Sequence, residues 1–214
     1  FHVIRLKYSE ETLTRIAEKY LRSVSPRVGP KLLVEKSGGL PIYIAEAVKY
    51  IKNEGRTDLP NGIRALIVKV LESEVKRIGA GAFLLYYIVS HYPGVPGEYL
   101  KHIGEMLHLS GTPKYLDKVY SPEGTPPRLS LHTWYKYVTD DIVRYYEGDM
   151  RGLEWYEGVK GPLDSIKSAL SSLVDSLRKD RVINSYFQSV YDLFTSSPTV
   201  PEELKAKLRE FHEG

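Results

Sequence analysis

Three features of this 214-residue sequence predict a mainly α-helical fold. Apolar residues recur every three or four positions along most of the chain, which gathers them on one face of a helix. Clusters of Gly and Pro separate these stretches at short intervals and mark turns between helices. Only one short stretch, residues 128–131, is predicted to be a strand.

The first predicted unit, residues 1–62, is a small helical bundle. Ser9 followed by Glu10 and Glu11 predicts a helix start, because the hydroxyl caps free backbone N–H groups and the acids suit the positive end of the helix dipole. A second short helix ends near the stretch Ser37–Pro41, where Gly-Gly permits a tight turn and proline suits the first turn of a third helix.

The second predicted unit, residues 63–139, begins with the longest clean amphipathic run in the chain, Ile63 to Ile78. Three short helices, a Pro- and Gly-rich hairpin and the short strand are expected next, in the order and with the lengths of a winged helix. A further helix is expected over residues 132–146. The three short helices are predicted at 83–91, 97–107 and 113–119.

The third predicted unit, residues 140–214, is a helical extension with two apolar stripes, 163–177 and 182–194. The second stripe carries aromatic residues on more than one side of its helix, so an antiparallel helix pair cannot bury all of them. We expect an unidentified protein partner to bind 163–194, and burial within the chain is the alternative. The aromatic residues are Tyr186, Phe187, Tyr191 and Phe194.

The composition limits the compartment and the chemistry. Hydrophobic residues make up 42% of the chain, no window reaches the apolar length of a membrane span, and cysteine is absent. We therefore expect a cytoplasmic protein without disulfides or a membrane partner. Scarce Asn, Gln and Met beside abundant charged residues resemble a thermophile protein. A net charge of +3 does not by itself require a nucleic-acid partner.

Several catalytic motifs are missing from the sequence. It contains no phosphate loop of the form G-x-x-x-x-G-K-[ST], no G-x-S-x-G turn and no pair of histidines at positions i and i+4. The adjacent acids Asp140 and Asp141 point to different sides of a helix. We therefore expect neither a complete catalytic centre nor a metal site in this chain.

The stretch Ser37-Gly38-Gly39-Leu40-Pro41, between two helices of a small bundle, resembles the glycine-glycine-leucine-proline motif in the lid of STAND-type ATPases. These are the signal-transduction branch of the AAA+ class and include archaeal members. The stretch Leu6–Glu11 resembles the entry into such a lid, and Leu59–Arg64 resembles the exit from it. A winged helix follows the lid in these families. The resemblance covers roughly residues 1–139.

This resemblance implies a nucleotide switch whose phosphate loop and magnesium-binding acid lie in an ATPase core domain upstream of Phe1. Pro41 would pack on the adenine of ADP, and the backbone of Gly38 and Gly39 would allow its close approach. His132 stands where many members have a histidine that reaches the β-phosphate, although Thr133 departs from the Asp that follows it there. ATP or ADP with Mg is thus implied for a full-length protein, and no cofactor for this chain alone.

Two other functions remain open. A winged-helix regulator would place Lys114, Lys118 and Arg128 against DNA phosphates, with Thr112 or Lys114 near base edges. DNA is the partner under this alternative, although the third helix is short and its basic residues are few. Alternatively, the chain is a structural helical module that binds other proteins. For His132, the alternative to a phosphate contact is a surface histidine at the end of a helix.

Overall fold

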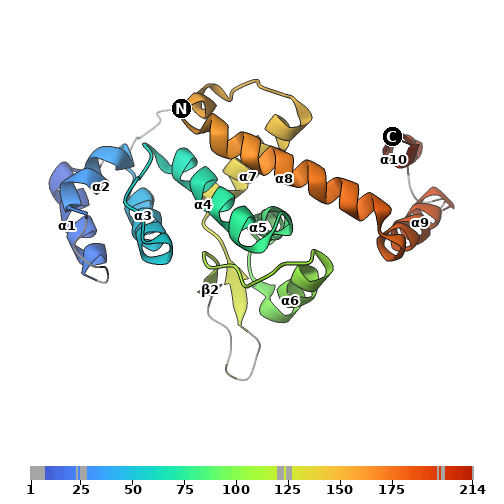
Figure 1. Ribbon diagram of the computed structural model, residues 1–214, viewed down its shortest axis with the longest axis horizontal. Coiled ribbons are helices and arrows are strands. Elements are labelled where there is room, and N and C mark those ends of the chain that lie inside the picture. Colours follow the sequence, from blue (N-terminus) through green and yellow to red (C-terminus); the bar gives the residue numbers. More distant parts are fainter. Residues whose placement is uncertain are drawn as a thin grey trace. The chain divides into compact units, whose positions relative to one another are not determined.

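The computed structural model describes residues 8–22, 24, 28–119, 123, 127–196, 198 and 201–213, and it confirms a mainly helical fold with one small antiparallel sheet (Figure 1). Its contacts form two compact units, residues 1–170 and 171–214. The division at 62 and 139 stays a prediction. The elements in chain order are α1 Glu10–Leu21, α2 Pro30–Ser37, α3 Pro41–Glu54, α4 Ile63–Ile78, α5 Gly81–His91, β1 Val95–Pro96, α6 Gly97–Met106, β2 Asp117–Val119, β3 Arg128–Ser130, α7 Thr133–Glu147, the 3₁₀ helix η1 Glu154–Val159, α8 Lys160–Lys179, α9 Arg181–Ser196 and α10 Glu202–Glu213.

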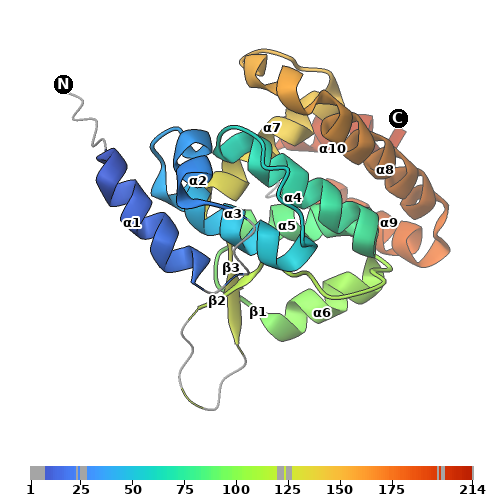
Figure 2. The ribbon, with the colours of Figure 1, turned by 60° about the vertical axis from the view of Figure 1, so that its left-hand side comes forward.

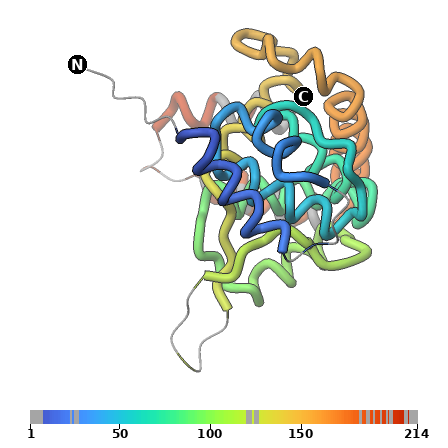
Figure 3. Tube along the Cα trace, turned by 90° about the vertical axis from the view of Figure 1, so that its left-hand side faces the viewer, coloured from blue at the N-terminus to red at the C-terminus, as the bar shows by residue number. Residues whose placement is uncertain are grey.

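Helices α1, α2 and α3 pack against one another at one end of the first unit, where Figure 3 shows them together. The Ser9 hydroxyl caps α1 as predicted and accepts a hydrogen bond from the Thr12 backbone N–H at 3.2 Å. Each helix buries an apolar face, with Leu13, Leu33 and Ile44 in the shared core. The small bundle therefore forms because three amphipathic faces cover one another.

Helices α4, α5 and α7 form the centre of the first unit, and α3 packs on α4 (Figure 2). Their core is rich in tyrosine. Tyr86 on α5 and Tyr135 on α7 are fully buried, and their rings stack with centroids 6.1 Å apart. Because a buried tyrosine hydroxyl needs a polar partner, this core must also contain polar side chains.

The sheet has the strand order β1-β3-β2, with both pairs antiparallel. Leu129 is opposite Val95 on one side and Lys118 on the other. The predicted strand over 128–131 is confirmed. The predicted helix over 113–119 is wrong, because residues 107–116 contain no helix and residues 117–119 pair with β3. We call residues 107–116 the connecting segment.

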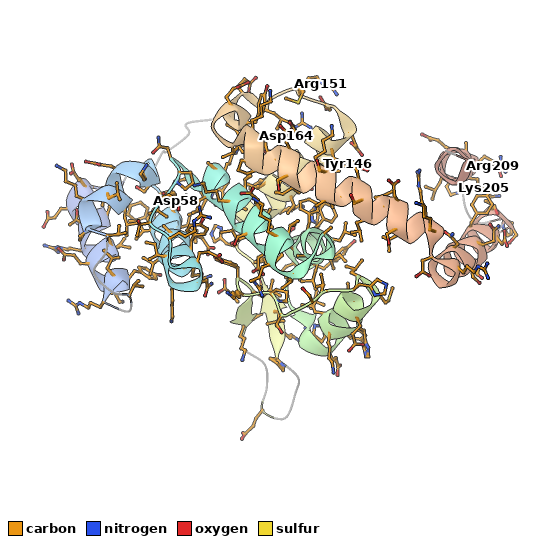
Figure 4. The ribbon with its side chains drawn as sticks, in the orientation of Figure 1. Asp58, Tyr146, Arg151, Asp164, Lys205 and Arg209 are labelled. Atoms are coloured by element: carbon orange, nitrogen blue, oxygen red, sulfur yellow. The ribbon has the colours of Figure 1, made fainter. Side chains whose placement is uncertain are left out.

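The end of α7 is attached to α8, which continues past the boundary between the units at residue 170. The Tyr145 hydroxyl donates to Asp164 at 2.5 Å, and α8 buries Leu163 and Ile166 beside it. Figure 4 shows the neighbouring Tyr146 and Asp164 on these two helices. The first half of α8 is therefore part of the first unit.

The second unit contains the packed pair α9 and α10. The helices predicted at 163–177 and 182–194 are confirmed as α8 and α9. The side chains of Tyr186, Phe187 and Phe194 lie outside those described, and Tyr191 is half-buried. A partner at 163–194 therefore stays a prediction. None of the helices in the described ranges combines the length and the apolar content that crossing a membrane requires.

Candidate functional site

The Gly-Gly motif forms an exposed turn between α2 and α3, here called the glycine turn (residues 37–40). Gly38 and Gly39 have φ angles of 59° and 84°, which residues with a side chain rarely adopt. The Ser37 hydroxyl accepts a hydrogen bond from the Gly39 N–H at 3.1 Å and donates to the Val34 carbonyl at 2.7 Å. Apart from the residues directly before and after each glycine, no atom lies within 4 Å of a Cβ placed on either one. The hydrogen bonds of Ser37 thus hold the turn in place, and its two glycines are exposed.

Pro41 is the first residue of α3, as predicted, and it is half-buried beside the glycine turn. The residue that caps this helix, Leu40, has no side chain able to accept the free N–H groups of the first turn. Within that turn Pro41 has no N–H, and the Tyr43 N–H donates to the Leu40 carbonyl at 3.1 Å. An exposed backbone turn and a proline ring therefore lie together, and this combination can contact a flat apolar ring.

A second turn, residues 60–62, is tied to the glycine turn. The Gly62 N–H donates to the Lys36 carbonyl at 2.9 Å, and the Lys36 ammonium donates to the Asn61 side chain at 3.1 Å. The Tyr43 hydroxyl donates to the Pro60 carbonyl at 2.6 Å, and burial raises the pKa of Tyr43 so that it keeps its proton. Asp58, just before this turn and labelled in Figure 4, accepts a hydrogen bond from the Lys69 ammonium at 2.9 Å. The two turns form one surface.

His132 caps α7, where its Nδ1 accepts a hydrogen bond from the Trp134 N–H at 3.3 Å. Its ring is exposed. Trp134 also packs on the Arg64 guanidinium, 5.9 Å from the ring centroid, at the start of α4. The start of α7 thus reaches the start of α4, which follows the second turn. Among the described contacts, none joins His132 directly to Gly38, Gly39 or Pro41.

Helix α3 connects this surface to the sheet and to α7. Glu46 is 2% exposed and accepts from the Tyr135 hydroxyl of α7 at 2.9 Å and from Lys49 at 3.0 Å. Lys49 also donates to Asp117 of β2 at 2.7 Å. Burial opposes the charge of Lys49, but Glu46 and Asp117 outweigh it and raise its pKa. Helix α3 therefore contacts the glycine turn at its start, and α7 and β2 along its side.

Glu74 of α4 is the most connected buried carboxylate. It is fully buried, and it accepts from Arg77 at 2.5 Å, from the Tyr86 hydroxyl at 2.8 Å and from the Lys114 N–H at 3.0 Å. The Tyr86 hydroxyl in turn accepts from the Tyr115 N–H at 3.1 Å. These bonds fasten the connecting segment to α4 and α5.

Glu54, the last residue of α3, accepts from the Tyr115 hydroxyl at 2.9 Å and from Ser73 at 2.6 Å. Burial and the adjacent carboxylates raise the pKa of Tyr86, Tyr115 and Tyr135, so the hydroxyls of these three tyrosines stay protonated and donate. We call this set the glutamate–tyrosine network. Its members are Glu46, Glu54, Glu74, Tyr86, Tyr115 and Tyr135.

Sequence reasoning missed the glutamate–tyrosine network, although the sequence holds a signal for it. Glu74 lies three residues after Leu71 and four before Ile78, within the apolar stripe of α4. Glu46 lies three residues after Tyr43 and four before Tyr50, both buried on α3. A glutamate on the apolar face of a helix must have a buried partner, and the abundant tyrosines supply one.

The residues of the DNA alternative do not gather on one face. The Thr112 carbonyl accepts from Arg77 at 2.8 Å, and the Lys114 ammonium lies 3.5 Å from the Asn53 carbonyl. Lys118 and Arg128 occupy successive registers of the β2–β3 pair, so their side chains point to opposite faces of the sheet. No helix carries Thr112 or Lys114 into a DNA groove, because the connecting segment is not helical.

Ser90, His91 and Asp140 approach the geometry of a hydrolytic triad. His91 Nε2 lies 2.9 Å from Asp140, and Nδ1 lies 3.1 Å from the Ser90 hydroxyl. However, Nδ1 is also 2.9 Å from the Tyr87 carbonyl, to which the Ser90 hydroxyl itself donates at 2.8 Å. A histidine whose two nitrogens face acceptors cannot take the serine proton. The arrangement fastens α5 to α7.

Comparisons with protein-family models, with curated proteins and with solved structures give no match to this chain.

Proposed function

We propose that this chain is the part of a STAND-type ATPase that relays the nucleotide state to a partner, through its lid and winged helix. The observation that carries the proposal is the position of α3. This helix begins at Pro41 in the glycine turn and holds Tyr135 of α7 and Asp117 of β2 through Glu46 and Lys49. A displacement of its first turn therefore acts on the sheet and on α7.

The proposed nucleotide contacts are Gly38, Gly39 and Pro41, with ATP or ADP and its Mg ion held mainly by a core domain outside this chain. The exposed glycine turn lets a planar base approach the backbone, and the Pro41 ring supplies an apolar surface for it. His132 would reach the β-phosphate in one of the two nucleotide states. A relay requires that the two states make different contacts.

The strand order β1-β3-β2, with α5 and α6 on either side of β1 in the chain, supports the winged-helix part of the proposal. The connecting segment takes the place of a third helix and is fastened to Glu74 and Tyr86. These contacts favour a winged helix that packs within the protein over one that reads bases. A DNA-binding regulator is therefore the less supported function.

Removing the Pro41 ring tests the nucleotide contact in the full-length ATPase. Pro41→Ala is expected to release ADP about five to ten times faster, since one lost apolar contact is worth roughly 1 kcal/mol. Stopped-flow release of a fluorescent ADP measures the rate. Pro30→Ala is the matched control, because Pro30 also opens a helix after a glycine-containing loop. Equal release rates in both variants would show that the motif is only a turn.

A break in the link between α3 and β2 tests the relay. Lys49→Met is expected to leave ADP affinity unchanged and to abolish the nucleotide-dependent change in distance between α2 and the hairpin. Spin labels on cysteines introduced at Glu35 and Glu123 of the full-length ATPase report this distance by pulsed EPR, and these 214 residues contain no other cysteine. Lys52→Met, on the exposed side of the same helix, is the control. A wild-type distance change in Lys49→Met would refute the relay.

DNA binding by this chain is expected to be weak and independent of sequence. A dissociation constant in the range of about 10⁻⁴ to 10⁻⁶ M at physiological salt is typical of non-specific attraction. Mobility-shift titration against random duplexes measures it. Sequence-dependent nanomolar binding that is lost in Lys114→Ala and Lys118→Ala would instead establish the DNA-binding regulator.

A further inference from the structure

A groove of about 540 Å³ lies between α6, the connecting segment and the β2–β3 hairpin. Figure 2 shows α6 and the three strands beside one another. No part of the glycine turn or of His132 belongs to this groove, so it is separate from the proposed nucleotide contacts. Leucines dominate its lining, namely Leu85, Leu100, Leu109, Leu116 and Leu129.

One face of α6 forms a wall of the groove. Its lining residues Gly97, Leu100, Lys101, Gly104 and Glu105 follow the spacing i, i+3, i+4, i+7 and i+8, which is a single helical stripe. Two of them are glycines, so this wall has little side-chain bulk. A helix of ten residues is about 15 Å long, and a ligand along it can therefore extend for about three helical turns.

Lysines lie on both walls of the groove. Lys101 comes from α6, and Lys118 comes from β2. Glu105 is the single acidic lining residue, and its carboxylate lies 3.9 Å from the Lys101 ammonium on the same stripe of α6. Lys118 forms no ion pair with a residue that the structure describes. The groove thus combines an apolar floor with a net positive charge at its edges.

We propose that this groove binds an amphipathic α-helix of a partner protein, with an apolar face and acidic residues on both flanks. The apolar face would enter between the leucines, and the acidic flanks would meet Lys101 and Lys118. Helices with anchors at i, i+3, i+4 and i+7 bind grooves of this kind. Charge complementarity at the edges sets partner choice and association rate.

Two other occupants fit the groove less well. In a two-fold dimer formed through this groove, the groove of one copy would face the same groove of the other copy. The lysines of the two grooves would then repel one another. An added β-strand would pair with the edge of β2, which has only three residues. The partner helix is the occupant that matches the floor, the length and the charge together.

A pair of charge-swapped peptides tests the proposal on the 214-residue chain. Both are stapled 14-residue helices with a fluorescein label and leucines at i, i+3, i+4 and i+7, one flanked by Glu and the other by Lys. Stapling is needed because isolated helices of this length are marginal in water. Fluorescence anisotropy at 0.15 M salt gives the two dissociation constants for the chain and for its variants.

The Glu-flanked peptide is expected to bind with a micromolar dissociation constant and at least ten times more tightly than the Lys-flanked peptide. The double variant Lys101→Glu/Lys118→Glu is expected to reverse this preference, and the control Lys31→Glu/Lys52→Glu, with equal charge change on α2 and α3, to keep it. Circular dichroism checks that both variants are folded.

Three results would overturn the proposal. The first is the failure of both peptides to bind at 1 mM. The second is binding that is equal for the two peptides or insensitive to the charge reversal. The third is a dimer in sedimentation experiments that dissociates in Lys101→Glu/Lys118→Glu, because the occupant would then be a second copy. None of these results depends on whether the glycine turn binds nucleotide.

Discussion

Glu74→Ala is expected to cost about 3–5 kcal/mol of unfolding free energy, because it removes a fully buried carboxylate that accepts from two buried groups and from the partly exposed Arg77. The substitution leaves Arg77 without its carboxylate and the Tyr86 hydroxyl and Lys114 N–H without their acceptor. The cavity left by the side chain adds to the loss. Urea unfolding followed by circular dichroism measures the change.

Glu11→Ala is the matched control for this prediction. Glu11 forms an arginine pair of similar length, 2.6 Å to Arg15, but both side chains are about three-quarters exposed. An exposed pair contributes at most about 1 kcal/mol. If the two variants lose equal stability, the glutamate–tyrosine network does not hold the first unit together.

Gly81→Ala is expected to destabilise the protein by about 1–3 kcal/mol through overpacking. A Cβ at this position would lie 2.6 Å from the Cβ of Leu107 and 2.9 Å from its carbonyl oxygen. Because the obstacle is backbone and the base of a side chain, it cannot move aside cheaply. The start of α5 and the connecting segment would have to separate. Thermal unfolding reports the loss of stability.

Gly104→Ala adds the same methyl group as Gly81→Ala but is expected to stabilise the protein. A Cβ on Gly104 would meet Leu109 at 3.4 Å, an ordinary contact. Replacing glycine inside a helix by alanine then stabilises by roughly 0.5–1 kcal/mol. Stability losses of the same size at both positions would contradict the close approach at Gly81.

Most helices were predictable from the sequence because each has an apolar stripe at helical spacing, and α2, α3, α4 and α7 end at a glycine. The stripe Ile63 to Ile78 became α4 with the expected bounds, and Pro41 opened α3. Residues 113–119 were not predictable in this way. Seven residues cover less than two helical turns, and such a short pattern does not separate helix from strand.

The conformation of residues 113–119 depends on contacts with residues far away in the sequence. The Lys114 N–H and the Tyr115 N–H bond to side chains of α4 and α5, and residues 117–119 pair with β3. Asp117 pairs with Lys49, 68 residues earlier. Local spacing carries no information about such contacts. The glycine turn, in contrast, was found because its geometry depends on its own residues.

The hydrogen bond from Tyr135 to Glu46 also has a consequence for synthesis on the ribosome. The two residues are 89 positions apart, so at about 5–20 residues per second Tyr135 follows Glu46 by roughly 4–18 s, whereas Lys49, the other partner of Glu46, is made at once. During that interval the nascent bundle of α1, α2 and α3 holds a carboxylate on a face that will later be buried. That charge keeps the face hydrated and opposes premature association of nascent chains. We expect Glu46→Leu to produce more aggregated protein during translation, even if the finished chain folds.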